Sequence, residues 1–373
     1  MLNDLDIYNK SLNKKIFIKL KNNIKENNFI FGDSVKKFEN KLSNYIGSKY
    51  TITVGSGTDA LLLSLMSLNL TKNDEVIIPS FSWLSVLEVV LLLGLKFKFV
   101  DTCLNSFNLD IKSLKKIINK NTKVIISTSL FGRSVDLIEL KKICKKNKII
   151  LIEDGAQNFG SRIGNLSSLN IADLTCTSFF PSKNLGCYGD GGAIFTNKKS
   201  LAEKLKKLRN HGQSKYNESE LLGINSRLGS LQATVLIEKL KDIKNKKKKQ
   251  VSLYKRYEKF FNNKKIIGFP IENIYRKLKF DNMYCQFSIL VKKRGLLIKY
   301  LKKFRIDYKI YYSKPLYNQF SIKKNYKLKN TEYICNRIIS LPFNDISVKR
   351  QKKTFEVLNK IINFDRGIFF EKK

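Results

Sequence analysis

Residues 50–79 read YTITVGSGTDALLLSLMSLNLTKNDEVIIP, and they predict a strand, a glycine-rich turn, a helix and a second strand. The segments 50–54 and 75–79 are short and rich in β-branched residues, which favours strands. Between them, the apolar residues of 58–70 recur at helical spacing. Because the turn Gly55–Asp59 joins a strand directly to a helix, its backbone amides can face a phosphate group.

The same alternation of strands and helices continues downstream and predicts a mainly parallel sheet covered on both faces by helices. In such α/β sheets, ligands bind beyond the carboxyl ends of the strands. Further strands are expected at 96–100, 123–127, 149–153 and 193–196, and helices at 83–93, 137–146 and 201–210, the last ending at His211-Gly212.

The regular alternation of strands and helices ends after a long helix expected at 232–249. Strands are expected at 284–291 and 309–312, with a helix at 294–304 between them. We therefore expect a large domain at residues 1–245 and a smaller α+β domain at 246–373.

Composition bounds the class of protein. The chain has 373 residues and 43% apolar content, as in a soluble protein of about two or three domains. The longest apolar run, 84–95, is interrupted by polar residues and is too short to span a membrane. The N-terminus has no signal-peptide pattern, so we expect a cytoplasmic protein. Six scattered cysteines and a single histidine do not predict a metal site, and the thiols are expected to be reduced.

The formal net charge of +40 suggests two interpretations. One is a protein that binds nucleic acid or another anionic surface. The other is a lysine-rich composition without a nucleic-acid site, in which the charge only helps to attract an anionic substrate. The densest run, Lys244–Lys249, continues a helical pattern and is typical of a solvated helix face. We therefore expect no nucleic-acid partner.

Residues 175–192 read TCTSFFPSKNLGCYGDGG and place Lys183 in a loop between Ser178 and a glycine cluster. Upstream, Asp154 follows an apolar strand. An amine, an acid and a phosphate-sized cradle of serine and glycine are the parts that hold pyridoxal phosphate as a Schiff base. Singly, each has an ordinary explanation: a common helix-start turn, an aspartate that caps a turn, and one lysine among many. Their joint occurrence, in order on a βαβ scaffold, predicts a pyridoxal-phosphate enzyme.

At these residues the chain resembles the DegT/DnrJ/EryC1/StrS family of sugar aminotransferases, from about Phe29 to Phe364. Further matching motifs are Ser56–Leu61, Pro79–Trp83, Leu208–Gly212, Gly223–Leu228 and Leu231–Ala233. The resemblance implies a fold-type I, pyridoxal-phosphate-dependent enzyme that acts on nucleotide-linked keto sugars. It also implies glutamate as amino donor and a product used for surface polysaccharide such as lipopolysaccharide.

The resemblance also implies roles for individual residues. Lys183 would form the Schiff base and move the proton, and Asp154 would pair with the pyridine nitrogen. Trp83 would stack on the ring, and Gln157 would lie against it near its oxygen. The phosphate would be held by Gly57, Thr58 and Ser178, and Asp59 would also belong to the cofactor-binding residues.

The implied enzyme is a homodimer with a shared site, because Asn225 would reach the phosphate of the other subunit. Arg227 would contact the substrate, and Tyr311 and Tyr312 stand where relatives contact the sugar. Each of these residues has a structural alternative: Trp83 could be core, Asn225 a helix cap and Arg227 part of an ion pair. The sole histidine, His211, is expected to end a helix.

The residues after Lys183, Asn184–Gly192, resemble those of relatives that aminate carbon 3 of the sugar, most closely enzymes acting on UDP-2-acetamido-2-deoxy-3-oxo-glucuronate. The chain departs from the family at Ser129, where histidine is usual, and at Tyr311 and Tyr317 of the segment 311–319, which leaves the sugar open. A 4-keto sugar is the alternative substrate. A dehydratase on the same scaffold would have histidine at 183, and a non-catalytic nucleic-acid-binding protein would lack the cofactor.

Overall fold

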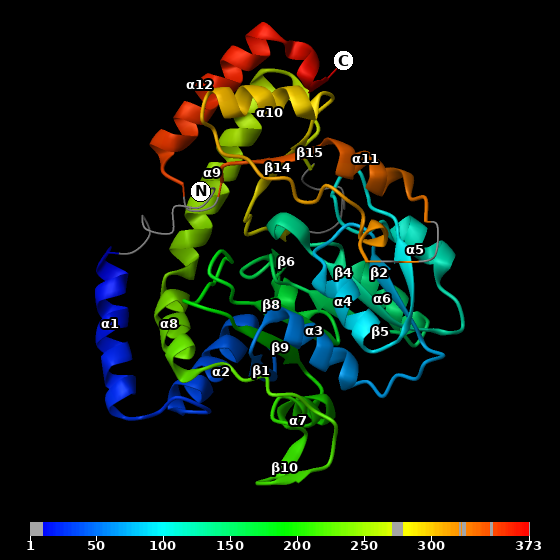
Figure 1. Ribbon diagram of the computed structural model, residues 1–373, viewed down its shortest axis with the longest axis vertical. Helices are drawn as coiled ribbons and strands as arrows, with labels where there is room; N and C mark the ends of the chain where they lie inside the picture. Colours follow the sequence, from blue (N-terminus) through cyan, green and yellow to red (C-terminus); the bar gives the residue numbers. More distant parts are fainter. Residues whose placement is uncertain (1–9, 271–278, 321, 323–325, 344–345, 373) are drawn as a thin grey trace.

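The structure is a computed structural model that describes residues 10–270, 279–320, 322, 326–343 and 346–372. A large part surrounds a central sheet, and a smaller part sits above one edge of it (Figure 1). The long helix α9 (Ile243–Asn263) runs from one part to the other.

The central sheet has seven strands in the order β1-β9-β8-β5-β4-β2-β3. All run parallel except β9, which is antiparallel to both of its neighbours. This confirms the predicted mainly parallel sheet. β9 runs antiparallel to β8 because only a loop connects the two strands. A parallel neighbour would need a longer crossover connection, usually a helix. The strands are β1 (Tyr50–Val54), β2 (Glu75–Pro79), β3 (Lys96–Val100), β4 (Thr122–Thr128), β5 (Ile150–Asp154), β8 (Leu174–Ser178) and β9 (Gly192–Thr196).

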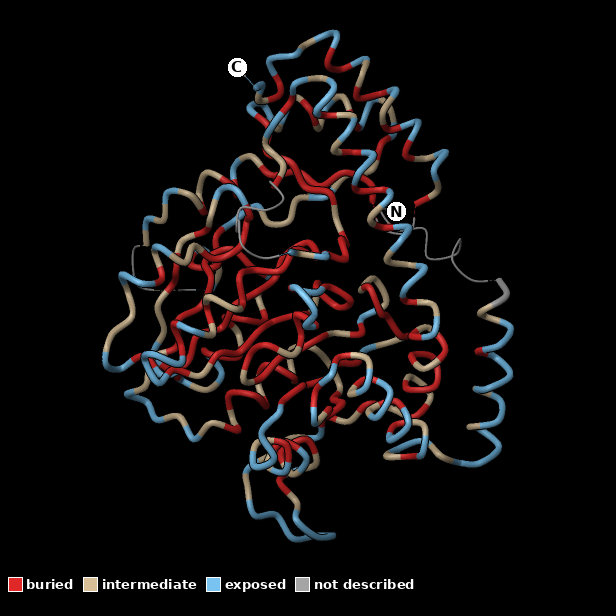
Figure 2. Tube along the Cα trace, turned by 180° about the vertical axis from the view of Figure 1, so that it is seen from behind, coloured by how far each residue is buried: buried red, intermediate tan, exposed pale blue. Residues whose placement is uncertain are grey.

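Helices cover both faces of the sheet, and for this reason its strands are apolar on both sides. One face packs against α3 (Gly57–Met66), α4 (Ser85–Leu92) and α7 (Lys199–Leu208). The other packs against α2 (Asp33–Ile46), α5 (Ile111–Ile117), α6 (Leu137–Lys146) and α8 (Ser230–Lys241). The helix α1 (Lys10–Lys25) lies beside α8 at the edge of the molecule, where most of it is exposed (Figure 2).

Short elements complete the large part. A three-stranded sheet forms from β13 (Phe280–Asp281), β6 (Arg162–Ile163) and β7 (Leu166–Ser167), and an exposed hairpin from β10 (Gln213–Lys215) and β11 (Glu218–Ser219). Single helical turns lie at Leu130–Gly132 and Ser168–Asn170.

The smaller part has its own apolar core, built from α9, a two-stranded sheet and the C-terminal helix. Its elements are β14 (Phe287–Leu290), β15 (Ile338–Leu341), α10 (Arg294–Lys303), α11 (Lys329–Arg337), α12 (Val348–Phe364), the pair β12 (Ile266–Ile267) and β16 (Phe370–Glu371), and the turns Leu316–Asn318 and Arg366–Ile368. The proposed domain boundary at residues 245/246 falls in the first turn of α9.

Three details differ from the expectations. The helix expected at 232–249 is two helices, α8 and α9, which meet at Asp242. The prediction of a strand at 309–312 is wrong, because in this range only Lys309 pairs with another strand residue, through an isolated bridge to Ser340. The helix expected to end at His211-Gly212 ends at Leu208. It ends there because the backbone of residues 208–211 pairs with that of residues 224–226 instead of continuing the helix.

A buried ion pair fixes the chain after α7. The guanidinium of Arg209 donates to Glu39 Oε1 at 2.6 Å and to the carbonyl oxygen of Thr53 at 2.8 Å. The same Glu39 oxygen accepts the amide N–H of Thr53 at 2.9 Å. This pair ties α2 to the end of β1, directly before the glycine turn, and removing Glu39 would leave the buried charge of Arg209 unpaired.

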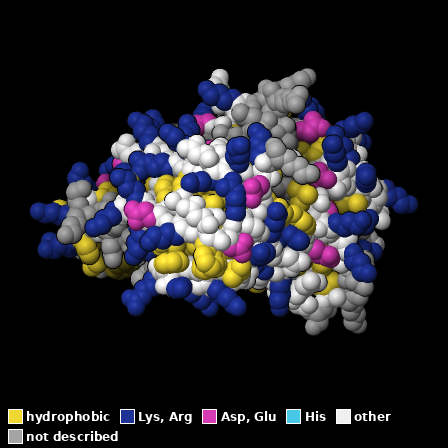
Figure 3. Space-filling view, turned by 90° about the horizontal axis from the view of Figure 1, so that it is seen from above, with side chains coloured by type: hydrophobic (Ala, Val, Ile, Leu, Met, Phe, Trp, Pro, Cys, Tyr) yellow, Lys and Arg dark blue, Asp and Glu magenta, His cyan; other side chains and the backbone are white. Residues whose placement is uncertain are grey.

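Basic side chains are spread over the whole face seen in Figure 3, with acidic groups scattered among them. A shallow hollow of about 730 Å³ along α9 is lined largely by basic side chains, Lys247 and Lys255 among them. The excess charge is therefore not confined to one patch on that face. Among the described residues, no helix is both long enough and apolar enough to cross a membrane.

Candidate active site

A cavity of about 650 Å³ lies where five strands of the central sheet end. Its walls include the residues that follow β1 and β2, the last residues of β4, β5 and β8, and segments of the smaller part. This is the carboxyl edge of the parallel strands, where the sequence predicted a ligand site. The predicted residues that line it are Gly57, Thr58, Trp83, Asp154, Gln157, Ser178, Lys183, Tyr311 and Tyr312.

The turn from β1 to α3 forms an anion cradle at one end of the cavity. Ser56 caps α3, and its hydroxyl oxygen accepts the amide N–H of Asp59 at 3.0 Å. The preceding amides of Gly57 and Thr58 are first-turn groups that have no partner within a helix. A methyl group on Gly57 would come within 2.8 Å of Ser178 Cβ, so only glycine allows β8 and this turn to approach so closely. The two amides, the Ser178 hydroxyl and the helix N-terminus together suit a phosphate group.

Asp154 is the acid of the cavity. It ends β5, is 6% exposed, and accepts the amide N–H of Ala156 on Oδ1 at 3.1 Å. Burial raises the pKa of its carboxyl, while the Ala156 hydrogen bond and the charge of Lys183 oppose the rise. A buried carboxylate with a free second oxygen is suited to bind a cationic N–H group, since such a partner repays its desolvation.

The Lys183 loop is held by its own residues. The amide of Phe179 donates to the Gly191 carbonyl at 2.7 Å, which closes the loop at its base. Asn184 is buried and donates to the carbonyl oxygens of Phe159 at 3.2 Å and Met283 at 2.9 Å. These contacts fix the backbone on both sides of Lys183, so its side chain enters the cavity from a rigid support.

Gln157 and Tyr312 form a hydrogen-bonded pair in the wall. Gln157 Nε2 donates to the Tyr312 hydroxyl at 3.1 Å, and Gln157 Oε1 accepts the amide N–H of Phe131 at 2.7 Å. Trp83 is 53% exposed, with its ring centroid 6.0 Å from that of Tyr312. An exposed indole at a cavity is available to cover a planar ligand.

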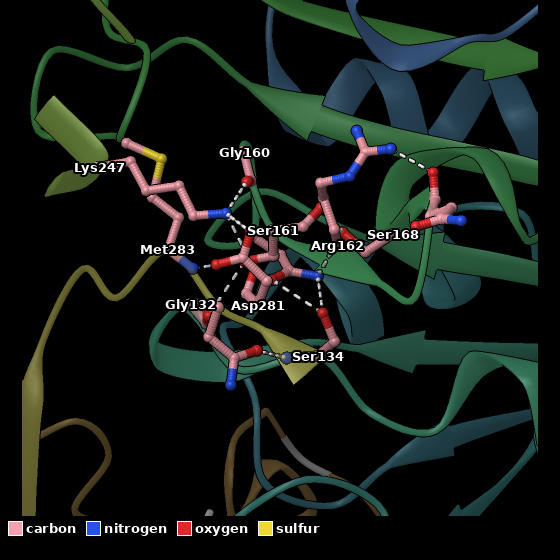
Figure 4. Close-up of polar contacts among 12 residues, drawn as sticks. Gly132, Ser134, Gly160, Ser161, Arg162, Ser168, Lys247, Asp281 and Met283 are labelled. Carbon is pink, nitrogen blue, oxygen red and sulfur yellow. Dashed lines mark hydrogen bonds and ion pairs between the residues drawn. The ribbon is translucent and has the colours of Figure 1, made fainter. Parts of the chain in front are cut away.

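The segment that follows β13 places Cys285 and Gln286 in the cavity wall, and polar contacts anchor its start (Figure 4). Lys247 Nζ on α9 donates to the carbonyl oxygen of Gly160 at 2.9 Å and to Asp281 Oδ2 at 2.7 Å. The Ser161 hydroxyl accepts the amide N–H of Met283 at 2.8 Å. Cys285 and Gln286, which line the cavity, are thereby positioned by the large part.

Several other residues of the cavity were not predicted as site residues. Their positions follow from tertiary packing, apart from Ser56, which precedes a helix and could have been recognised as its cap. These residues are Ser56, Ser85, Thr128, Ser182, Cys285, Gln286, Lys309, Ser340, Leu341 and Phe343.

Three predicted site residues are not in the wall of this cavity. The carboxylate of Asp59 accepts the Ser226 hydroxyl at 2.8 Å. Asn225 bridges to Asn210 through the backbone, and Arg227 donates to Asn210 Oδ1 at 3.2 Å. Within one chain, Asn225 and Arg227 therefore do not reach the cavity that holds Lys183.

Two positions at which the chain departs from its relatives also lie elsewhere. Ser129 is fully buried and donates to Glu153. Tyr317 is 5% exposed and donates to Glu332 at 3.1 Å. Of the divergent positions, only Tyr311 faces the cavity. The sole histidine, His211, is exposed and outside the cavity wall.

The residues present fit pyridoxal phosphate. The anion cradle of Gly57, Thr58 and Ser178 suits its phosphate, and Asp154 suits its protonated ring nitrogen. Lys183 supplies the amine and Trp83 an aromatic face. In the described part of the chain, no group of three or more His, Cys, Asp or Glu residues is placed to bind a metal ion.

Comparison with known proteins gives consistent matches. The sequence profile of the DegT/DnrJ/EryC1/StrS aminotransferase family matches residues 10–358. UDP-2-acetamido-2-deoxy-3-oxo-D-glucuronate aminotransferase of Pseudomonas aeruginosa is 34% identical, over 92% of this chain and 95% of that protein. UDP-N-acetyl-3-dehydro-alpha-D-glucosamine 3-aminotransferase of Acidithiobacillus ferrooxidans is 30% identical over 84% of each chain. The crystal structure of NtdA from Bacillus subtilis with bound cofactor PMP has a TM-score of 0.88 and 27% identity, covering 95% of this chain and 83% of that one.

Proposed function

Because the chain belongs to the DegT/DnrJ/EryC1/StrS aminotransferase family, we propose that it transfers an amino group from glutamate to a nucleotide-linked 3-keto sugar. The enzyme is a pyridoxal-phosphate-dependent sugar aminotransferase. The observation that carries the proposal is the meeting of Lys183, Asp154 and the Gly57–Thr58 cradle in one cavity.

When bound, pyridoxal phosphate supplies an electron-withdrawing ring that accepts and releases the amino group. Lys183 Nζ would hold the cofactor covalently and would serve as the base that carries the proton at the reacting carbon of the substrate. Asp154 keeps the ring nitrogen protonated by offering its buried carboxylate. Gly57, Thr58 and Ser178 would bind the phosphate, Trp83 would cover one face of the ring, and Gln157 would lie near the hydroxyl oxygen on the ring.

Amination at carbon 3 of the sugar is supported by two observations. The segment Asn184–Gly192 has the pattern of relatives that aminate this carbon, and two relatives carry names that specify a 3-oxo or 3-dehydro sugar. A UDP-linked 2-acetamido-3-oxo-uronate or a related sugar is thus the proposed substrate, with a 4-keto sugar as the alternative. The product would serve the synthesis of a surface polysaccharide.

A panel of keto sugars tests this substrate assignment. With glutamate as donor, we expect kcat/KM for UDP-linked 3-keto sugars to exceed that for 4-keto sugars by about 100-fold, because a carbonyl displaced by one ring position is misaligned with Lys183. The measurement is product mass together with the 2-oxoglutarate formed. Amination of the 4-keto sugars alone would overturn the assignment to carbon 3.

We also propose that the enzyme is a homodimer whose two sites each use residues of both subunits. The support is that Asn225 and Arg227 lie outside the cavity of their own chain. In this arrangement, Asn225 binds the phosphate in the partner's cavity and Arg227 contacts the partner's substrate.

Mixed dimers test the shared site. The Lys183→Ala and Asn225→Ala variants are each expected to lose activity, the second because its phosphate loses a hydrogen bond. When equal amounts are unfolded together and refolded, half of the dimers are mixed, and each mixed dimer has one intact site. We therefore expect recovery to about a quarter of wild-type activity. If Asn225 served its own chain, the mixture would stay as inactive as its components.

A further inference from the structure

Glu153 and Asp154 are consecutive carboxyl groups at the end of β5. Because side chains alternate along a strand, the two point to opposite faces of the sheet. Asp154 lines the cavity, whereas Glu153 has no exposed surface and lies outside the cavity wall. A wholly buried carboxyl group directly behind the active site needs a structural or functional reason, because burial of such a group is costly.

The partners of Glu153 are hydroxyl groups at the end of β4. Ser127 donates to Glu153 Oε2, and Ser129 Oγ donates to Oε1 at 2.5 Å. Ser129 Oγ also accepts the amide N–H of Val135 at 3.2 Å. Within the described residues, no lysine or arginine forms an ion pair with Glu153. Ser129, which is bonded to Glu153, is thus also bonded to Val135. Through this serine, Glu153 holds the first and the last residue of the segment Ser129–Val135.

The middle of that segment reaches the active site. The amide N–H of Phe131 donates to Gln157 Oε1 at 2.7 Å, which leaves Gln157 Nε2 to donate to Tyr312. The carbonyl oxygen of Phe131 accepts the amide N–H of Cys285 at 3.2 Å. Which side of its amide Gln157 presents to each neighbour is thus set by the position of the Phe131 backbone.

We propose that Glu153 is a positioning residue of the active site, which fixes the segment Ser129–Val135 from the far side of the sheet and thereby orients Gln157. The inference rests on the proposed contact between Gln157 and the cofactor. Glu153 itself touches neither the cofactor nor the substrate.

Complete burial favours the protonated form of Glu153. Burial raises the pKa of Glu153 to about 8, and the hydrogen bonds from Ser127 and Ser129 offset only part of the rise. The titratable groups that interact with it are Asp154 on the same strand and the Cys176 thiol on β8. A neutral Glu153 retains acceptor capacity for the two serine hydroxyl groups, and it leaves Asp154 as the charged member of the pair.

The pH dependence of unfolding tests the protonated state. Between about pH 4.5 and 8 the folded protein binds this proton and the unfolded chain does not, so stability falls as pH rises. We expect the unfolding equilibrium constant of the full-length holoenzyme, relative to Glu153→Gln, to increase about tenfold per pH unit in this window. Other titrating groups cancel in the comparison. Parallel pH profiles of the two proteins would show that Glu153 is not a buried acid and would overturn its assigned form.

A double-mutant cycle tests the positioning role. Gln157→Ala and Glu153→Ala are each expected to weaken pyridoxal phosphate binding about tenfold, the loss typical of one hydrogen bond. Their double variant should be within about threefold of either single variant, because both break one chain of contacts. Glu153→Gln should restore binding, since its amide can both donate and accept. Ser129→Ala, which removes the same link with less loss of volume, should match Glu153→Ala.

The outcomes separate this inference from the proposed function. Fully additive losses, or unchanged binding in both Glu153→Ala and Ser129→Ala, would overturn the positioning role while leaving that of Gln157 intact. Unchanged binding in Gln157→Ala would remove the proposed role of Gln157, and this inference with it. The aminotransferase assignment, which depends on Lys183, would stand in either case. The readout is the dissociation constant from equilibrium dialysis and does not depend on turnover.

Discussion

Replacing Lys183 with alanine is expected to lower the rate of amino transfer by about 10³-fold or more, because it removes both the covalent link and the proton carrier. The visible absorption band of lysine-bound pyridoxal phosphate should disappear in the same variant. The fold should persist, since the contacts that close the loop come from the backbone of Phe179 and from the side chain of Asn184. Absorption spectra of the dialysed proteins and 2-oxoglutarate formation are the two measurements.

Lys309→Ala is the matched control, because Lys309 is another lysine in the wall of the same cavity. It should keep the absorption band, so that loss of charge from the cavity is distinguished from loss of the covalent link. A wild-type protein without the band, even with added pyridoxal phosphate, would contradict the enzyme assignment. A band that persists in Lys183→Ala would place the covalent link on another lysine.

The fold was predictable from the sequence where the information is local. The apolar, β-branched segments 50–54 and 75–79 are strands at the predicted residues. The break between α8 and α9 at Asp242 was missed, because the apolar spacing continues across it. The absence of a strand at 309–312 was also missed, since strand pairing depends on a partner that is distant in the sequence.

The sequence predicted the cavity residues that belong to contiguous motifs, but not the others. Lys183, Asp154 and the turn at Gly57 belong to contiguous motifs with a fixed chemical purpose, and the structure brings them together. Cys285 is held in the wall by contacts of its segment with Ser161 and Phe131. Such contacts join residues far apart in the chain and leave no local pattern.

Asp154 has a different task from Glu153, although the two are adjacent and both are buried. Complete burial favours the neutral acid at Glu153, and the Ser127 and Ser129 hydroxyl groups oppose this only in part, whereas Asp154 has the Ala156 amide and the nearby charge of Lys183, which both favour the carboxylate. A protonated ring nitrogen would complete this environment by pairing with the free carboxylate oxygen. Neutralising Asp154 should therefore reduce catalysis without preventing the covalent attachment of the cofactor.

Asp154→Asn is accordingly expected to lower kcat by about 10²–10³-fold, because the ring nitrogen loses the charge that keeps it protonated. The absorption band of lysine-bound pyridoxal phosphate should remain, since Lys183 is unchanged, and this separates the variant from Lys183→Ala. Asp154→Glu keeps the charge but displaces it by one methylene group, so it should lose less activity than the asparagine variant. Single-turnover rates with glutamate, followed at the cofactor band, measure the effect. Equal rates for Asp154→Asn and wild type would mean that the carboxylate serves only to position the Gly155–Gln157 turn. A greater loss of activity in Asp154→Glu than in Asp154→Asn would mean that the geometry of the side chain, rather than its charge, sets the rate.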